Sequence, residues 1–249
     1  MKQLYNGLSD GFIAGYTTGA DGHFRYFNLC DIGNYRSVAE TFHLTCDHMV
    51  RVHQGHTDRI RIVGSENGGE GILRAGTDAV YDAMISADAN LILCMISADC
   101  VPVFLYDDET GTIALVHSGR AGTMAEIAAK TVKKMRTHFG TKPENLRAIL
   151  GPCLCAEHHE VREKDVSGFY HRFSDEECGL FLKKINSSYY VDMHTAIKIS
   201  LLRLGILPEH ITADPACTYE DPALPSWRRT HDPDAHMLSF LVRLNFEQA

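Results

Sequence analysis

Three short apolar segments near the middle of the chain constrain its fold more than any other feature. They are residues 91–96, 101–106 and 112–117, and their length and apolar content predict buried β-strands. The second and third segments are separated by residues 107–111, an Asp-Asp-Glu-Thr-Gly run that is typical of a hairpin turn. The centre of the chain is therefore expected to contribute several strands to a sheet, with at least one hairpin.

Helical segments are interleaved with these strands. A helix is predicted to begin at Thr123, where Glu126 completes a capping box, and to end at Gly140. A further strand is expected over residues 147–150 and a second helix over residues 193–204. We therefore expect an α/β or α+β fold in which mixed β-sheets are covered by helices, as a single domain over residues 1–249.

The overall composition narrows the class of protein. With 249 residues and a hydrophobic fraction of 45%, the chain can bury a substantial core. Its net charge of −8 argues against a nonspecific nucleic-acid binder, which needs a basic surface. The first residues lack the apolar core of a signal peptide, and the longest apolar run, residues 90–98, is too short to span a bilayer. We therefore expect a cytoplasmic monomer or homodimer with no nucleic-acid or membrane partner and with reduced cysteines.

Two histidines and one cysteine stand at the ends of predicted strands. Cys100 directly precedes the second apolar segment, His117 ends the third, and His56 precedes a strand-like run at residues 59–63. Two imidazoles and one thiol that meet in space form a three-ligand zinc site with an open position. The same side chains also suit a cysteine nucleophile with a histidine base, and each one alone is often only a buried structural residue.

The turn that follows His117 has the composition of an anion-binding segment. Gly119 and Gly122 allow the backbone to bend tightly between the strand and the predicted helix. The start of that helix, near Thr123, would present free N–H groups and a partial positive charge. His117 would then lie beside a phosphate or oxyanion pocket.

Several further segments form an ordered set of motifs along the chain. They are Gln54-Gly55-His56-Thr57-Asp58-Arg59-Ile60, Gly76-Thr77-Asp78-Ala79, Ala98-Asp99-Cys100-Val101-Pro102, His117-Ser118-Gly119 with Gly122-Thr123, Gly151-Pro152 with Glu160-Val161, Cys217-Thr218, and Ser226-Trp227-Arg228-Arg229. Through this set the chain resembles the YfiH/YlmD family, long described as polyphenol oxidoreductases or laccases and later as purine nucleoside-processing enzymes. The ordered set of segments is specific to this family, whereas any single segment also occurs in unrelated proteins.

The resemblance implies a metal-dependent enzyme. His56, Cys100 and His117 would be the metal ligands, with zinc as the expected ion and copper as the alternative. The implied activities are phosphorolysis of purine nucleosides such as adenosine and inosine, deamination of adenosine at the same site, and phosphorolysis of methylthioadenosine. The partners would then be small molecules, a purine nucleoside and phosphate.

Two segments depart from the family pattern. The family usually reads His-Ala-Gly-Trp-Arg-Gly around the histidine, whereas Arg120 and Ala121 replace the Trp-Arg pair here. After Pro152 the family often has Ser and Tyr, where this chain has Cys153, Cys155, His158 and His159. The resemblance therefore implies a divergent branch with the three metal ligands intact.

Both implied reactions need further groups beside the metal. Zinc lowers the pKa of bound water to about 7, and zinc deaminases use such a water to attack the purine ring. Asp99 is a candidate proton shuttle because it adjoins Cys100. The candidate donors to phosphate are Arg120, Thr123, Arg228 and Arg229.

Other functions are compatible with the same residues. Cys100 with a histidine base would make a metal-free cysteine hydrolase. A His₂Cys set also binds copper, as a polyphenol oxidase would require, although a multicopper oxidase needs more histidines in paired spacing. A binding module without turnover, or a hydrolase that corrects misincorporated peptidoglycan precursors, completes the alternatives.

Overall fold

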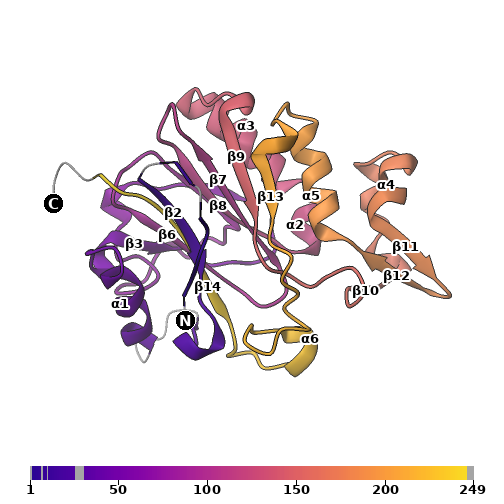
Figure 1. The fold of residues 1–249 in the computed structure, drawn as a ribbon, viewed down its shortest axis with the longest axis horizontal. Helices are drawn as coiled ribbons and strands as arrows, with labels where there is room; N and C mark the ends of the chain where they lie inside the picture. Colours follow the sequence, from indigo (N-terminus) through magenta and orange to yellow (C-terminus); the bar gives the residue numbers. More distant parts are fainter. Residues whose placement is uncertain (1, 7, 10, 26–30, 246–249) are drawn as a thin grey trace.

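Two β-sheets packed face to face form the centre of the molecule, of which the computed structural model describes residues 2–6, 8–9, 11–25 and 31–245 (Figure 1). The five-stranded sheet has the order β1-β2-β14-β6-β3, with bounds Gln3–Leu4, Phe12–Tyr16, Met237–Arg243, Ile92–Ser97 and Met49–Arg51. The six-stranded sheet has the order β13-β9-β7-β8-β5-β4, with bounds Ile211–Ala213, Leu146–Leu150, Val101–Asp107, Ile113–Ser118, Ala83–Ser86 and Ile60–Ile62. Both sheets are mixed, because β3–β6, β4–β5 and β13–β9 are parallel pairs among antiparallel ones.

Helices cover the outer faces of the two sheets. Helix α1 (Ile32–Glu40) packs on the five-stranded sheet, while α2 (Arg120–Met124), α3 (Ile127–Phe139) and α5 (Met193–Leu202) pack on the six-stranded sheet. A small sheet of order β10-β12-β11 projects beside these helices together with α4 (Figure 1). Helix α6 lies at the bottom of the same view, in the connection that leads to β14. The bounds of these elements are Glu160–Arg162, Ser188–Val191, Leu182–Ile185, Asp175–Phe181 and Trp227–Thr230.

Short 3₁₀ turns connect several of these elements. They comprise Gly19–Asp21, Cys46–His48, Ser65–Asn67, Pro143–Asn145, Glu163–Asp165, Phe169–His171 and Pro208–His210. The mixed sheets covered by helices confirm the predicted fold class, and the single domain stays a prediction.

Alternation along the central strands decides which layer each side chain joins. Successive side chains of a strand point to opposite faces of its sheet. In β7, Phe104 and Tyr106 pack between the two sheets, while Val103 and Leu105 pack beneath the helices. Every residue of β7 is buried, which explains the continuous apolar run in the sequence.

The chain changes sheets between β6 and β7. β6 pairs with β14 and β3 in one sheet, whereas β7 pairs with β8 and β9 in the other. Asp99, between them, adopts a left-handed backbone conformation with φ of 85°, which makes this short crossing possible. The predicted hairpin is confirmed as the antiparallel β7–β8 pair, in which Pro102 lies opposite His117.

The helix predicted to begin at Thr123 begins earlier, and the capping box is wrong. α2 begins at Arg120 with Gly119 as its N-cap, so Thr123 is a buried residue inside α2 and its hydroxyl bonds Ser118 Oγ at 2.8 Å. Glu126 is the left-handed N-cap residue that separates α2 from α3. The end of α3 is as predicted, since Gly140 has a φ of 72° and its N–H donates to the carbonyl of Arg136.

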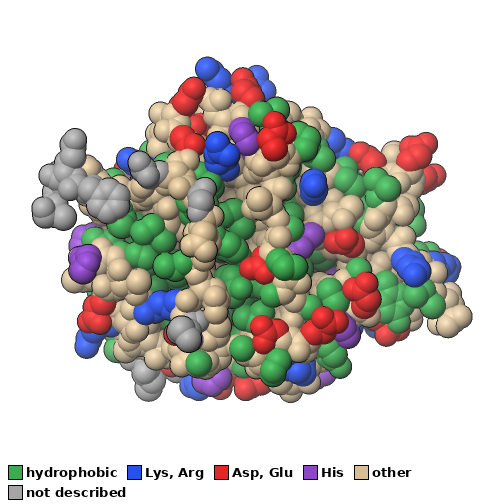
Figure 2. All heavy atoms as spheres, viewed as in Figure 1, with side chains coloured by type: hydrophobic (Ala, Val, Ile, Leu, Met, Phe, Trp, Pro, Cys, Tyr) green, Lys and Arg blue, Asp and Glu red, His purple; other side chains and the backbone are tan. Residues whose placement is uncertain are grey.

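The surface carries both signs of charge. Figure 2 shows acidic and basic side chains interspersed over the described part of one face, with apolar side chains exposed between them. Across the described residues, no helix is long and apolar enough to cross a membrane.

The inter-sheet core predicts a large effect of removing one aromatic ring. Phe104→Ala is expected to lower the free energy of unfolding by about 3–5 kcal/mol, because a fully buried ring leaves a cavity between the sheets. Urea denaturation measures this change. Leu180→Ala is the control, since Leu180 is 68% exposed and its truncation should change stability by less than about 0.5 kcal/mol.

Candidate metal centre and substrate pocket

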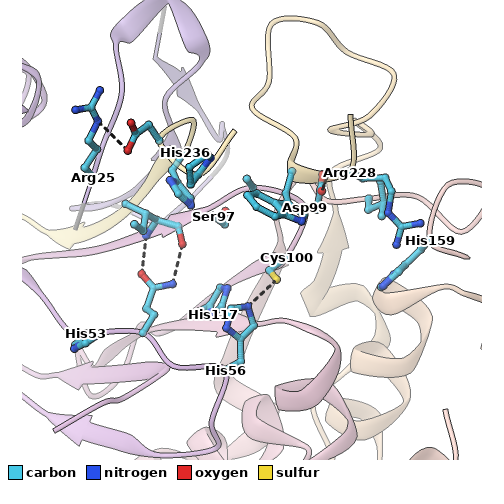
Figure 3. A pocket seen from close by; sticks show the side chains of 17 residues that line it. Arg25, His53, His56, Ser97, Asp99, Cys100, His117, His159, Arg228 and His236 are labelled. Atoms are coloured by element: carbon cyan, nitrogen blue, oxygen red, sulfur yellow. Dashed lines mark hydrogen bonds and ion pairs between the residues drawn. The ribbon is translucent and has the colours of Figure 1, made fainter. Parts of the chain in front are cut away.

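His56, Cys100 and His117 come together at one end of the inner strands β7 and β8 of the six-stranded sheet (Figure 3). Cys100 lies just before β7 and His117 lies near the end of the antiparallel strand β8, so the two side chains meet where these strands end and begin. His56 comes from the loop that leads into β4. One ligand atom from each of the three lies within 4.8 Å of the others.

The geometry of this trio suits a tetrahedral metal ion. Cys100 Sγ lies 3.8 Å from His56 Nε2, and the two imidazole rings are 4.9 Å apart and nearly perpendicular at 76°. Donor atoms around a tetrahedral zinc lie roughly 3.5 Å apart. A metal held by these three ligands would keep a fourth position for water or substrate, and the trio lines a pocket.

A buried carboxylate, Asp82, orients two members of the trio. His117 Nδ1 donates to Asp82 Oδ1 at 2.8 Å, which leaves Nε2 of the same ring for a metal. The Asp82 carboxylate also accepts the backbone N–H groups of Gly55, His56 and Thr57. His56 has a left-handed φ of 56°, and these hydrogen bonds hold its loop in that conformation.

Without a metal, the charges within the site favour a thiolate at Cys100 paired with an imidazolium at His117. Burial alone would raise the pKa of the Cys100 thiol, but the charge and hydrogen bond of His117 lower that pKa to about 6. Burial alone would lower the pKa of His117, but the thiolate of Cys100 and the carboxylate of Asp82 raise it to about 10. Despite its burial, Asp82 has a pKa well below its usual value because His117 and Thr57 donate to it. The thiol is therefore a thiolate at neutral pH, the form that binds metals.

Gly119 leaves room for this arrangement. A Cβ atom built on Gly119 would lie 2.8 Å from Cys100 Sγ and 3.0 Å from His56 Cδ2. Any larger residue would therefore displace two members of the trio. This close approach, and not an unusual backbone conformation, accounts for the glycine, because its φ is −72°.

A pocket of about 820 Å³ opens in front of the trio and draws its walls from distant segments. Its walls include Gln54 and His53 from the His56 loop, and Trp227 and Arg228 from α6. Gln54 anchors the loop to the other sheet, because its side-chain amide bonds both the carbonyl and the N–H of Ile96 in β6. A smaller adjoining pocket of about 310 Å³ shares His56 and Cys100 and is lined by Arg120.

The four predicted phosphate-binding residues lie in different places. Arg228 lines the larger pocket and Arg120 the smaller one. Thr123 does not line either pocket. Arg229 points its guanidinium to backbone carbonyls of the segment before α6, such as those of Thr218 and Tyr219.

Asp99 lines the pocket, but both oxygens of its carboxylate already have partners. Oδ1 accepts the hydroxyl of Thr218 at 2.7 Å, and Oδ2 accepts the backbone N–H of Arg228 at 2.6 Å. Its side chain therefore ties two loops to the β6–β7 crossing. This arrangement is that of a positioning residue and does not favour the predicted role as a proton shuttle.

The sequence analysis did not single out Asp82, and it named His159 and Trp227 without giving either a role in the site. The available signal for Asp82 was its position directly before β5, the strand that pairs with β8, which places it opposite His117. His159 lines both pockets, and burial together with the charges of Arg228 and Arg120 lowers its pKa to about 4. Its imidazole is therefore neutral at pH 7, a form that can donate or accept a hydrogen bond.

Comparisons with known proteins give the family. Residues 32–243 match the family profile described as multi-copper polyphenol oxidoreductase laccase. The crystal structure of YfiH from Bacillus licheniformis superposes with a TM-score of 0.86 at 25% identity, covering 94% of this chain and 93% of that one. YlmD from Geobacillus stearothermophilus gives a TM-score of 0.85 at 25% identity, with coverage of 95% and 93%. The chain belongs to the YfiH/YlmD family.

Curated relatives in this family are named for a reaction on nucleosides. A purine nucleoside phosphorylase of Corynebacterium glutamicum is 31% identical over 199 residues, which cover 79% of this chain and 75% of that protein. The purine nucleoside phosphorylase YlmD of Bacillus subtilis is 25% identical over 213 residues, covering 84% and 76%. The family profile and these relatives thus carry two different functional descriptions.

The role of Asp82 is tested by removing its charge while keeping its shape. Asp82→Asn is expected to lower zinc affinity about 10–100-fold, because the amide cannot orient His117 and accept the N–H groups of the His56 loop at once. Competition with a chromophoric chelator measures this affinity. Asp78→Asn, at an exposed carboxylate, is the control and should bind zinc as the parent does.

Proposed function

We propose that this protein is a zinc-dependent purine nucleoside phosphorylase that also deaminates adenosine. The observation that carries the proposal is the convergence of His56, Cys100 and His117 on the wall of a pocket of about 820 Å³. This volume is typical of small-molecule sites. The names of the relatives from Corynebacterium glutamicum and Bacillus subtilis support the reaction class.

The donor set supports a catalytic metal ion. Two imidazoles, one thiolate and an open position correspond to three-ligand catalytic zinc sites. When bound there, zinc supplies a Lewis acid that faces the pocket. Asp82 orients His117 toward it, and Gly119, without a Cβ, leaves room for the side chains of Cys100 and His56.

Side chains of the pocket suit a purine nucleoside and phosphate. Trp227 is 48% exposed and lines the pocket, so its ring offers a stacking surface to a purine base. Arg228 and Arg120 flank the trio, and each guanidinium directs only some of its five N–H donors to the protein. Neutral His159 lines both pockets and can bond a sugar hydroxyl.

The geometry supports phosphorolysis as the main reaction. An oxygen of a hydrogenphosphate ion forms a bond to C1′ of the ribose while the bond from C1′ to the purine nitrogen breaks, and the purine leaves with the proton that the hydrogenphosphate carried. Arg120 and Arg228 would hold the phosphate beside C1′. Methylthioadenosine is a further expected substrate because the same bond is broken in it.

The decisive test is the loss of the thiol. Cys100→Ala is expected to abolish metal binding by the trio, and turnover with it, because two imidazoles alone do not complete the site. Bound zinc and copper are measured on the purified protein, which is then incubated with adenosine and phosphate. Adenine, ribose 1-phosphate and inosine are the expected products of the parent.

The control for this experiment is Cys46→Ala, whose thiol packs in the core beneath α1 and should leave metal content and turnover unchanged. An alanine variant at position 100 with full activity and normal zinc content refutes the assignment. Copper in place of zinc, with oxidation of phenols and no cleavage of nucleosides, supports the polyphenol oxidase instead.

One observation favours a second candidate function, a metal-free cysteine hydrolase. The pKa of the Cys100 thiol is lowered to about 6, and His117 lies beside it as a base or proton donor. Such an enzyme would act on an acyl or related substrate through Cys100. It needs no metal for turnover.

Iodoacetamide and a chelator distinguish the two candidates. For the zinc enzyme, we expect the chelator to abolish turnover and added zinc to restore it. Bound zinc should also protect Cys100 from alkylation. Rapid inactivation by iodoacetamide that the chelator does not mimic favours the cysteine hydrolase.

A further inference from the structure

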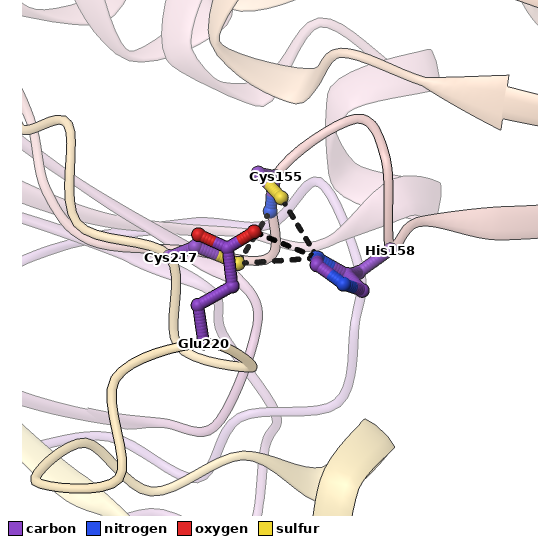
Figure 4. Close-up of side chains that lie close together, drawn as sticks. All are labelled: Cys155, His158, Cys217 and Glu220. Carbon is purple, nitrogen blue, oxygen red and sulfur yellow. Dashed lines mark hydrogen bonds and ion pairs between the residues drawn. The ribbon is translucent and has the colours of Figure 1, made fainter.

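A second group of metal-ligating side chains lies in loops outside the His56–Cys100–His117 trio (Figure 4). It consists of Cys155, His158, Cys217 and Glu220, and one ligand atom of each lies within 4.8 Å of the other three. His158 Nδ1 is 3.0 Å from Cys155 Sγ, 3.8 Å from Cys217 Sγ and 3.5 Å from Glu220 Oε1. These separations bracket the roughly 3.5 Å expected between donors around a tetrahedral zinc.

Two turns of the same spacing provide the four ligands. Cys155 and His158 stand at the two ends of one turn, and Cys217 and Glu220 stand at the two ends of another. Each turn is closed by hydrogen bonds to the carbonyl of its cysteine, from His158 and His159 in the first and from Asp221 in the second. Two ligands separated by two residues in a tight turn are typical of structural zinc sites.

A backbone N–H group already donates to the sulfur of Cys217. The N–H of Cys155 points to Cys217 Sγ at 3.3 Å. The two turns are also joined directly, because Cys153 and Cys217 form a parallel β-bridge and Thr218 N–H donates to the carbonyl of Cys153. Cys155 and Cys217 are thus held near one another by these main-chain contacts.

The imidazole of His158 is fixed in its ligating orientation. Its ring stacks on Tyr219, with centroids 4.3 Å apart and an interplanar angle of 22°. This contact aims Nδ1 at the two sulfur atoms and at Glu220 (Figure 4). Tyr219 lies inside the second turn, so each turn positions a ligand of the other.

Two arginines place positive charge next to this cluster. Arg228 donates to the carbonyl of His158 at 3.1 Å, and Arg229 donates to the carbonyls of Thr218 and Tyr219. Two thiolates and a carboxylate carry one more negative charge than a divalent ion neutralises. The guanidinium groups offset that excess.

We propose that Cys155, His158, Cys217 and Glu220 bind a structural zinc ion. Thiolate and imidazole donors select zinc over magnesium or calcium, and four protein ligands leave no open position for catalysis. The ion joins the loop after β9 to the loop that leads into α6. The proposal does not depend on which reaction the trio catalyses.

This second site braces the wall of the substrate pocket. The first loop carries Leu154 and His159, which line the pocket. The second loop carries Thr218, whose hydroxyl bonds Asp99, the residue next to Cys100. Zinc at the second site therefore fixes the pocket's outer wall relative to the trio without touching the substrate.

The experiment uses the full chain with the trio disabled by Cys100→Ala, so that metal at the second site is measured alone. The purified variant is loaded with zinc, desalted and analysed by inductively coupled plasma mass spectrometry. We expect one zinc per chain, and none when Cys155→Ser is added. Cys178→Ser is the matched control at a buried thiol elsewhere, and it should retain the zinc.

Cobalt absorption identifies the ligand atoms directly, and this measurement does not depend on the folding of the Cys155→Ser variant. In the Cys100→Ala background, cobalt should show the intense visible bands of a tetrahedral site together with thiolate charge-transfer absorption. Glu220→Gln, at a side chain that is 62% exposed, should keep the fold and lower zinc affinity by at least about tenfold.

Three outcomes overturn the proposal. One is a Cys100→Ala protein that holds no zinc after loading. Another is zinc retained equally with and without Cys155→Ser. The third is an intact mass and peptide map that show a disulfide between Cys155 and Cys217 in place of a metal. Because turnover is not the readout, failure of the proposed nucleoside chemistry leaves this test unaffected.

Discussion

The buried carboxylate of Asp82 is the constraint on which the trio depends. A charged group inside a protein is stable only when several donors replace its lost hydration. Here the donors are the imidazole of His117 and three consecutive N–H groups of the His56 loop. One side chain thereby fixes a strand end and a loop that are far apart in sequence, and it orients the imidazole of a candidate metal ligand at the same time.

The two-sheet architecture explains why the pocket lies where it does. The chain leaves the five-stranded sheet after β6 and enters the six-stranded sheet at β7, and Cys100 stands at that crossing. Gln54 spans the same gap from the other side by bonding Ile96 of β6. The pocket is therefore formed where the two sheets diverge, and loops of the C-terminal half close it.

Those loops add a wall of pocket residues beside the candidate metal centre. The Asp99 carboxylate accepts hydrogen bonds from the hydroxyl of Thr218 and the backbone N–H of Arg228. The loops that carry Trp227 and Arg228 are therefore attached to the residue beside Cys100. A shift of this outer wall would alter how a substrate lies against the trio while leaving the ligands in place. The cluster of Cys155, His158, Cys217 and Glu220 lies in this wall, which gives the departure from the family pattern a structural interpretation.

Much of the architecture follows from local sequence, because strands and hairpins depend on apolar content and turn chemistry. The largely buried β6, the fully buried β7 and β8, the β7–β8 hairpin and the glycine end of α3 were all predictable, and the motifs indicated His56, Cys100 and His117 as a set. The start of α2 was not predictable. Thr123 and Glu126 have the spacing of a capping box, but Thr123 lies inside α2 and Glu126 is the N-cap of α3. The separation of β6 from β7 into different sheets, the role of Asp82 and the meeting of Cys155 with Cys217 were decided only by tertiary structure. Each depends on contacts between segments distant in sequence, and no local periodicity or spacing encodes such contacts.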